Sequence, residues 1–309
     1  MVDLSTSLGR LRLPSPVFTA SGCAAAGKEL DSYFDITKIG GIVTKSIMVE
    51  ARSGRPTPRM AETPSGMLNS IGLQGPGIES FLTNDLAWLR QRGARSIVSI
   101  AGNDVNEFGR LARRLWGVEG IAAIEVNISC PNVANRGLVF ACNLGSAQEV
   151  MAEVRRNAPS GVPLLAKLSP DVTDIVEIAR GVVDAGADGL SMINTLLGMV
   201  IDPVTLRPKL GGRTGGLSGP AIRPVAVRAV YQVHAALPKV PILGMGGIRT
   251  GRDALEFIAA GASAISVGTA IFNDPSSPMR IQQELAAELE ARGIERLQDV
   301  IGIAHEERV

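Results

Sequence analysis

Eight short apolar runs alternate along the chain with longer amphipathic stretches. The runs are rich in valine and isoleucine and are nearly continuous, which is typical of strands buried on both faces in a parallel sheet. They cover residues 16–20, 41–46, 96–102, 122–129, 163–169, 189–194, 241–247 and 264–270. The pattern therefore predicts eight parallel strands.

The stretches between the runs repeat apolar residues at helical spacing. In one, the apolar positions follow the i, i+3, i+4, i+7, i+8 pattern of a stripe that packs against a sheet: Ile175, Ile178, Ala179, Val182 and Val183. A second helix is predicted after Asn103 or Asp104, either of which suits an N-cap. Its apolar positions run from Val105 to Leu115.

Eight strand-then-helix units without a break in composition predict an α/β fold, a single (β/α)8 TIM barrel domain over residues 1–309. The alternative is a doubly wound open sheet, although no GxGxxG follows the first strand. Before the first unit, Gly9 and Arg10 lie between two short alternating stretches in residues 4–13. We expect a small N-terminal hairpin there that closes the bottom of the barrel.

The predicted connections differ in length on the two ends of the barrel. Helix-to-strand connections are short, whereas three strand-to-helix loops are long, at about 47–77, 130–144 and 195–218. All three would emerge at the C-terminal face, where barrel enzymes place their active sites. Long loops without regular structure are typical of lids and binding loops.

Charge and rare residues exclude several classes of protein. With 31 basic and 30 acidic side chains, the net charge of +1 gives no reason to expect a nucleic-acid partner. Two histidines and three cysteines without a CxxC disfavour a Ser-His-Asp triad, a disulfide framework and a metal site. Because neither a signal pattern nor an apolar run of about 18 residues is present, we expect a cytoplasmic protein without a membrane association.

Polar side chains follow the predicted strands at their C-terminal ends. They are Ser21, Lys45, Ser99, Asn127, Lys167 and Asn194. These ends converge on one mouth of a barrel, so the lysines indicate an anionic or electron-rich ligand and the asparagines suit an amide-bearing ring.

Two glycine pairs and one cysteine add candidate chemistry. Gly246-Gly247 ends run seven and Gly268-Thr269 ends run eight, which is where barrels bind phosphate through bare backbone N–H groups. Cys130 begins the long loop after run four, between polar residues and a proline, and its thiol could act as nucleophile or base. A phosphate-bearing cofactor or substrate is predicted.

Over its whole length the chain resembles the class 1 dihydroorotate dehydrogenases, and among them the B-type, NAD-linked catalytic subunit. The segments that carry the resemblance are residues 64–68 with Asn69-Ser70-Ile71-Gly72-Leu73, residues 127–132, Ile193-Asn194-Thr195, and the glycine-rich residues 214–220, 244–248 and 266–269. Their order and spacing match the family, which implies FMN at the mouth of the barrel and dihydroorotate stacked on the flavin.

The resemblance also assigns roles to residues. Flavin contacts are implied for Ser21, Lys45, Ser46, Asn127, Lys167, Ile193, Gly219, Gly246, Gly247, Gly268 and Thr269. Substrate contacts are implied for Lys45, Asn69, Ser70, Ile71, Gly72, Leu73, Asn127, Asn132, Asn194 and Thr195. Cys130 matches the catalytic base and Lys45 a catalytic cation. One position departs from the family, because Ser99 stands where an asparagine is usual. Ser99 is kept as a candidate flavin contact, and without the amide its contact would run through water or be absent.

The implied reaction is the oxidation of (S)-dihydroorotate to orotate in pyrimidine (UMP) biosynthesis. Cys130 would take the C5 proton and FMN the C6 hydride. The electrons would pass to NAD through a partner subunit with FAD and a [2Fe–2S] cluster, because this chain has neither a cysteine cluster nor a Rossmann fingerprint. A homodimer within a heterotetramer is implied.

Four alternatives stay open at this point. The first is an A-type enzyme that uses fumarate, and the second is a related FMN enzyme that resembles dihydropyrimidine dehydrogenase. The third is a barrel aldolase with Lys45 or Lys167 as its Schiff base. The fourth is a barrel that binds a phosphate ligand without catalysis.

Overall fold

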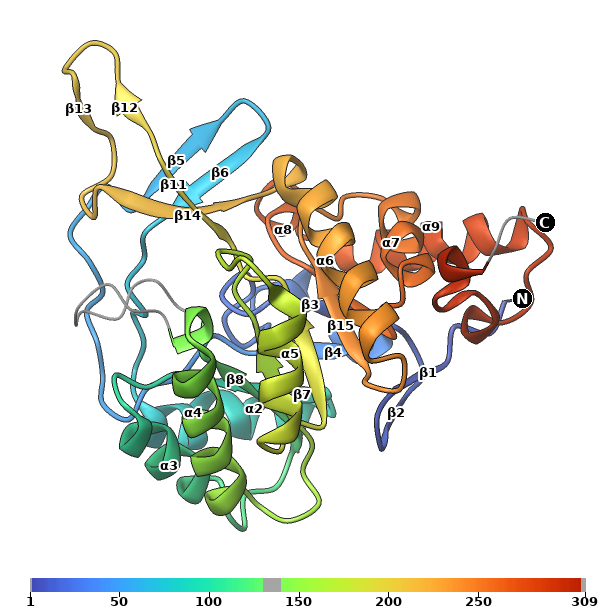
Figure 1. Ribbon diagram of the computed structural model, residues 1–309, viewed down its shortest axis with the longest axis horizontal. Helices are drawn as coiled ribbons and strands as arrows, with labels where there is room; N and C mark the ends of the chain where they lie inside the picture. Colours follow the sequence, from blue (N-terminus) through green and yellow to red (C-terminus); the bar gives the residue numbers. More distant parts are fainter. Residues whose placement is uncertain (1, 130–139, 307–309) are drawn as a thin grey trace.

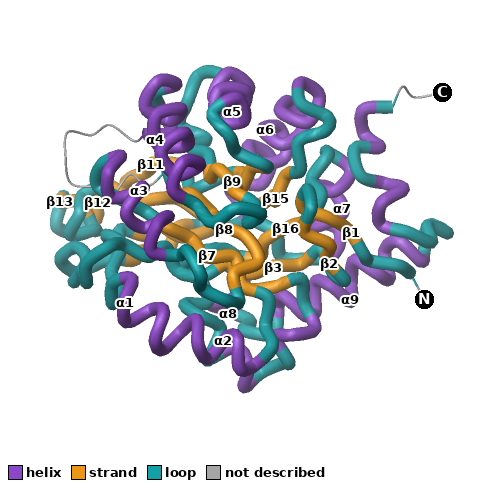
Figure 2. Tube along the Cα trace, turned by 90° about the horizontal axis from the view of Figure 1, so that it is seen from below, coloured by secondary structure: helices purple, strands orange, loops and turns teal. Residues whose placement is uncertain are grey.

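The fold is a closed barrel of eight parallel strands. The computed structural model describes residues 2–129 and 140–306, and within them the barrel strands follow one another in the order of the sequence (Figure 2). The strands are β3 (Val17–Thr19), β4 (Gly41–Val43), β7 (Ser96–Ile100), β8 (Ile121–Asn127), β9 (Leu164–Lys167), β10 (Gly189–Met192), β15 (Ile242–Met245) and β16 (Ala264–Val267). Each predicted run overlaps one of these strands, and the strands close into a barrel, which confirms the barrel over the open sheet.

Helices surround the barrel (Figure 2). They are α1 (Ile78–Ser80), continued through a π-helical stretch (Phe81–Leu86) into α2 (Ala87–Arg92), then α3 (Val105–Arg114), α4 (Leu144–Asn157), α5 (Ile175–Asp184), α6 (Arg223–Ala236), α7 (Gly251–Ala259), α8 (Ala270–Asn273) and α9 (Ser277–Glu290). Between β3 and β4, two 3-10 turns, Leu30–Ser32 and Ile36–Lys38, replace a helix. Among the described residues, no helix has the length and apolar character needed to cross a membrane.

The predicted helix signals agree with the structure. Asp104 caps α3 by accepting a hydrogen bond from the Glu107 N–H, so it is the N-cap rather than Asn103. In α5 the predicted stripe faces the sheet and is buried, except for Val183, which is half-buried. The helix positions were therefore encoded locally, by caps and periodicity.

A hairpin closes the bottom of the barrel. Strands β1 (Thr6–Leu8) and β2 (Leu11–Leu13) pair antiparallel around Gly9, as predicted (Figure 1). Leu8 and Leu13 are buried against the apolar side chains of the barrel interior, among them Phe18 and Ile97. The N-terminal end of the barrel is therefore filled with apolar side chains, which leaves the other end for a site.

The registers between neighbouring strands sort the inward side chains into layers of four from alternate strands. A lower layer is apolar: Phe18, Ile97, Leu165 and Leu243. The next consists of Val43, Glu125, Ser191 and Ser266, and the one above it of Ala20, Ser99, Lys167 and Met245. The same alternation brings Lys45, Asn127 and Gly268 to the mouth. The interior thus becomes more polar toward the C-terminal face.

The prediction that the long loops lack regular structure is wrong for two of them. Residues 47–77 contain β5 (Met60–Thr63) and β6 (Gly66–Asn69), and residues 195–218 contain β11 (Leu196–Met199), β12 (Ile201–Asp202), β13 (Arg207–Pro208) and β14 (Thr214–Ser218). Four of these form an antiparallel sheet in the order β11-β14-β6-β5. Periodicity missed it because the strands are only four or five residues long, and because β6 and β14, which join the two loops, lie far apart along the chain.

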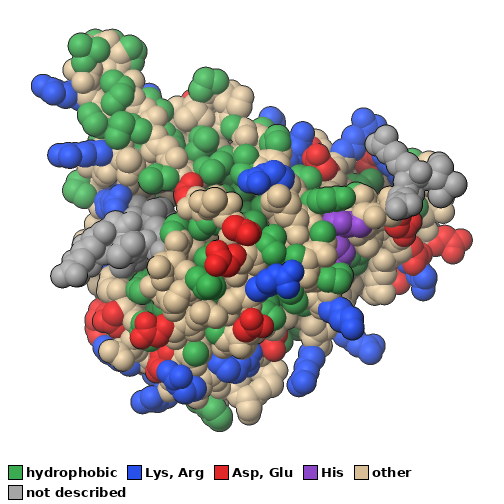
Figure 3. Space-filling model, viewed as in Figure 1, with side chains coloured by type: hydrophobic (Ala, Val, Ile, Leu, Met, Phe, Trp, Pro, Cys, Tyr) green, Lys and Arg blue, Asp and Glu red, His purple; other side chains and the backbone are tan. Residues whose placement is uncertain are grey.

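The sheet and the β12–β13 hairpin project beyond the barrel (Figure 1). Large apolar side chains are exposed along this projection, including Leu197, Met199, Ile201, Val204 and Leu206 (Figure 3). A contiguous exposed apolar patch is typical of a surface that contacts another protein.

Candidate active site

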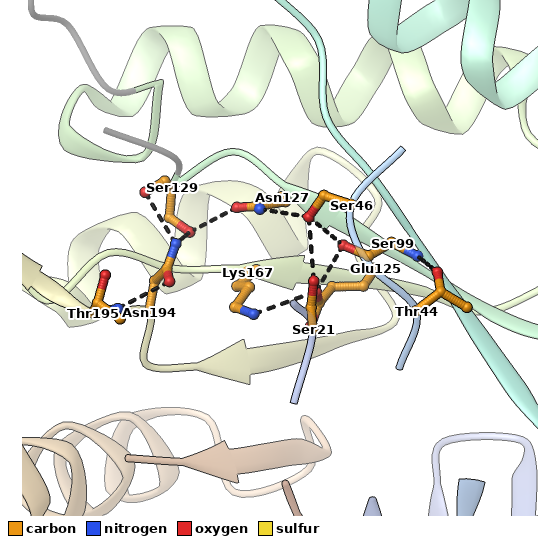
Figure 4. Close-up of polar contacts among 10 residues, drawn as sticks. All are labelled: Ser21, Thr44, Ser46, Ser99, Glu125, Asn127, Ser129, Lys167, Asn194 and Thr195. Atoms are coloured by element: carbon orange, nitrogen blue, oxygen red, sulfur yellow. Dashed lines mark hydrogen bonds and ion pairs between the residues drawn. The ribbon is translucent and has the colours of Figure 1, made fainter. Parts of the chain in front are cut away.

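Ser46 lies at the centre of a hydrogen-bonded group at the barrel mouth (Figure 4). Its hydroxyl lies 3.2 Å from Ser21 Oγ and 2.9 Å from Ser99 Oγ, and it accepts a 2.9 Å hydrogen bond from Asn127 Nδ2. These four residues come from the ends of four strands, β3, β4, β7 and β8. The structure therefore brings together four of the predicted flavin contacts.

The network continues from β8 to the end of β10. Ser129 Oγ donates to Asn127 Oδ1 over 3.1 Å, and Asn194 Nδ2 donates to Ser129 Oγ over 2.8 Å and to the Ser129 carbonyl over 3.1 Å. The Thr195 N–H in turn donates to Asn194 Oδ1 over 2.9 Å. Cys130 and Asn132 lie outside the described residues. The preceding residue, Ser129, is buried and held from both sides.

A buried carboxylate lies beneath this group, and the sequence analysis missed it. Glu125 is fully buried, and its Oε1 accepts a 2.9 Å hydrogen bond from Ser99 Oγ and lies 3.4 Å from Lys167 Nζ. Lys167 itself is only 4% exposed. An acidic residue in the middle of an otherwise apolar run predicted to be buried on both faces was the signal available.

Ser99 has a different place from the flavin contact that the resemblance implies for an asparagine. It is fully buried, with its hydroxyl between Ser46 and Glu125 and its N–H donating to Thr44 Oγ1 over 3.1 Å. In this structure Ser99 connects the surface of the mouth to the buried carboxylate below it.

Cys23 also belongs to the mouth, near both candidate lysines. Burial raises the pKa of the Cys23 thiol, while the ammonium groups of Lys167 and Lys45 act in the opposite direction. Its Sγ lies 3.5 Å from where a Cβ on Gly268 would be, and Lys45 Nζ lies 3.5 Å from the equivalent position on Gly22. Two lysines, a thiol and the bare backbone of Gly268 therefore share one region.

The candidate phosphate loops meet at the ends of β15 and β16. Gly247 has φ +74°, and a Cβ there would lie 2.6 Å from the Gly219 carbonyl oxygen, so these two backbones touch. Thr269 Oγ1 donates to Ser218 Oγ over 2.8 Å, which joins the end of β16 to the same segment. The Ile193 N–H donates to the Met245 carbonyl over 3.0 Å and joins β10 to β15.

The segment predicted to contact the substrate, Asn69 to Leu73, forms the wall of the candidate site above the barrel mouth. Asn69 ends β6 opposite Gly216 of β14, and its Nδ2 lies 3.4 Å from the Gly216 carbonyl. A Cβ on Gly216 would also meet Thr195 Oγ1. Ser70 and Ile71 are both held by Arg55, through the Ser70 hydroxyl and the Ile71 carbonyl. Gly72 and Leu73 turn through positive φ, at +80° and +55°.

These residues fit FMN by their chemistry. Gly246, Gly247 and Gly268 carry no side chains at the ends of β15 and β16, where barrels bind phosphate through bare backbone N–H groups. The buried ammonium of Lys167 suits the electron-rich edge of a flavin, and hydroxyls lie at the ends of β3 and β4 while amides lie at the ends of β8 and β10. The chemistry of these residues therefore suits a flat heterocycle with a phosphate tail.

Comparisons with known proteins point the same way. The family model described as dihydroorotate dehydrogenase matches residues 3–289. A protein of Geobacter sp. (strain M21) is 49% identical over 97% of both chains, and one of Geotalea uraniireducens is 50% identical over the same shares. A protein of Desulforamulus reducens is 49% identical over 98% of this chain and 99% of its own. All three are named dihydroorotate dehydrogenase B (NAD(+)), catalytic subunit.

Proposed function

The chain belongs to the dihydroorotate dehydrogenase family, and from this we propose that it oxidises dihydroorotate to orotate in pyrimidine biosynthesis. The observation that carries the proposal is the network from Ser46 through Asn127 and Ser129 to Asn194. This network connects residues that are predicted to contact the cofactor with residues that are predicted to contact the substrate. One member of the network, Ser129, directly precedes Cys130 in the chain.

FMN is the proposed cofactor, bound by a single barrel domain that comprises the whole chain. When bound, it supplies the acceptor for the hydride that leaves C6 of the substrate. Ser21, Ser46 and Asn127 would hold the flavin at the mouth, while Gly246, Gly247, Gly268 and Thr269 would hold its phosphate. Ser99 supports these contacts from below.

The substrate is oriented by amides on both sides of the mouth. Asn69, Asn127 and Asn194 offer donors and acceptors to its carboxylate and ring amides. The Asn132 side chain would join them, together with the backbone of Ser70 to Leu73 and with Thr195. Lys45 contributes positive charge beside the reacting ring. Such fixed contacts reduce the entropic part of the barrier.

Cys130 is the proposed base and takes the proton from C5. A thiolate is required for this step, and a cation nearby favours that form of a cysteine. The support is that Ser129, the residue directly before Cys130, is hydrogen-bonded to Asn127 and Asn194.

The final electron acceptor is proposed to be NAD, reached through a partner subunit with FAD and a [2Fe–2S] cluster. The support is the name that the relatives carry, a catalytic subunit linked to NAD(+). We propose a homodimer of this chain within the heterotetramer, in the cytoplasm.

The decisive experiment measures substrate and acceptor together. Purified protein is expected to be yellow, with flavin absorbance that is bleached anaerobically by dihydroorotate and not by dihydrouracil. Bleaching by dihydrouracil alone would instead indicate an enzyme that resembles dihydropyrimidine dehydrogenase. Colourless protein that FMN cannot reconstitute, but that borohydride traps with a carbonyl substrate, would indicate an aldolase.

The acceptor requires a second comparison. The lone chain is expected to turn over poorly with fumarate, whereas the complex with its co-expressed partner is expected to reduce NAD. Efficient turnover of the lone chain with fumarate would indicate the A-type reaction.

A further inference from the structure

Glu125 is a charged group in the interior of the barrel. It lies in the middle of β8 and is fully buried, one layer below Lys167 in the barrel registers. Removing a carboxylate from water is costly unless the charge is paired and hydrogen-bonded. A residue at such a position therefore needs a partner, and its partner is the ammonium of Lys167.

The two oxygens of Glu125 have different surroundings. Oε1 accepts from the hydroxyl of Ser99 and from the ammonium of Lys167. Oε2 has no hydrogen-bond partner among the residues that the structure describes, and the same holds for Ser191 Oγ and Ser266 Oγ. These three residues belong to one layer of inward side chains, so the carboxylate lies in a small polar layer directly above the apolar lower layer of the barrel.

We propose that Glu125 is a positioning residue that holds Lys167 from below and offsets part of its positive charge, thereby limiting the positive charge that Lys167 presents to the ring bound at the mouth. The proposal rests on the proposed function, because it takes that ring to be the flavin. Lys167 would have the flavin on one side and Glu125 on the other. The positive charge that acts on the flavin is therefore set by Lys167 and Glu125 together.

Ser99 makes this arrangement possible. A serine hydroxyl between β7 and β8 reaches Glu125 Oε1 over 2.9 Å and Ser46 Oγ over 2.9 Å, so it links the carboxylate to the flavin contacts. An asparagine at this position would add a larger amide group to a fully buried position and would replace the hydroxyl that donates to Glu125. The departure from the family pattern at Ser99 is thus part of the same unit.

The test measures the midpoint potential of bound FMN in the Glu125→Gln variant. The amide keeps the shape of the side chain and removes the charge, so the reduced, anionic flavin should be bound at least tenfold more tightly relative to the oxidised form. For a two-electron couple this is a rise of about 30 mV. An unchanged or lower potential would overturn the proposal.

Two further variants separate charge from structure. Glu125→Asp keeps the charge but withdraws it from Lys167, and it should raise the potential by less than Glu125→Gln. Ser266→Ala removes a hydroxyl from the same interior layer without touching Lys167, and it should leave the potential unchanged. An equal rise in Ser266→Ala would show that any disturbance of the layer suffices, and would count against Glu125.

These measurements also distinguish a failure of the proposed function from a failure of the role proposed for Glu125. If the wild-type protein does not bind FMN or is not reduced by dihydroorotate, the proposed function fails. If it does both and Glu125→Gln retains the wild-type potential, only the role of Glu125 fails.

Discussion

Asn194 Nδ2 donates to Ser129 Oγ over 2.8 Å and to the Ser129 carbonyl over 3.1 Å. The two residues follow β10 and β8, strands separated in the barrel by β9. One side chain thus fixes both the backbone and the hydroxyl of the residue that precedes Cys130. The contact therefore fixes the residue that directly precedes the proposed base in the chain.

Ser129→Ala should lower the turnover number by about tenfold to a hundredfold, because small misplacements of a reacting group have effects of that size. FMN content per chain should stay at the wild-type value. Ser169→Ala is a matched control, since Ser169 is a buried hydroxyl after β9 that accepts a hydrogen bond from the Asp171 N–H and interacts with the Cys142 thiol. Equal losses of turnover in the two variants would contradict the role given to Ser129.

Cys130→Ala should retain FMN and lose nearly all turnover, since no thiolate remains to take the C5 proton. Cys130→Ser should regain a little activity at high pH, because a hydroxyl is a much weaker base. Stopped-flow reduction of the flavin by dihydroorotate measures both effects. Rapid reduction in Cys130→Ala would remove this residue as the base.

Gly247→Ala should abolish FMN binding and destabilise the fold. The residue has φ +74°, and a Cβ would lie 2.6 Å from the Gly219 carbonyl oxygen. Gly161→Ala is the control, because Gly161 has φ +83° with open space around it. That variant should show only the strain of a left-handed alanine, about 1–2 kcal/mol in the free energy of unfolding. Similar melting temperatures and FMN contents for both variants would contradict the close approach.

The interior layer should hold ordered water. Glu125 Oε2, Ser191 Oγ and Ser266 Oγ are buried without partners among the described residues, and buried polar groups of this kind usually bind a water molecule. A high-resolution crystal structure should show density within hydrogen-bond distance of at least two of these atoms. An interior without such density would mean that the three atoms stay unsatisfied.

Stability should fall in acid partly through His234. Burial, followed by the nearby His305, lowers the pKa of His234 below its ordinary value. The unfolded chain then binds a proton at His234 more readily than the folded chain does. The contribution of neutral His234 to the free energy of unfolding is therefore complete above about pH 6.5 and decreases as the pH falls below it. The melting temperature of His234→Gln should therefore fall less than that of the wild type between about pH 8 and pH 5. Parallel curves would exclude His234 as the cause.

Much of the fold could be predicted because its signals are local. A strand buried on both faces reads as a continuous apolar run, and a helix shows its own cap and period, as Asp104 does for α3. The strand-end residues could be predicted for the same reason, since parallel strands end on one face of a barrel. Lys45, Asn127 and Lys167 were therefore identifiable without coordinates.

The sequence by itself determined the barrel and the family, because strand periodicity and motif order are properties of neighbouring residues. Only the tertiary structure decided which side chains meet. The pairing of Asn69 with Gly216, and the contact of Glu125 with Lys167, depend on the register between strands distant in sequence. Register decides which inward side chains share a layer, and no local pattern in the chain encodes it.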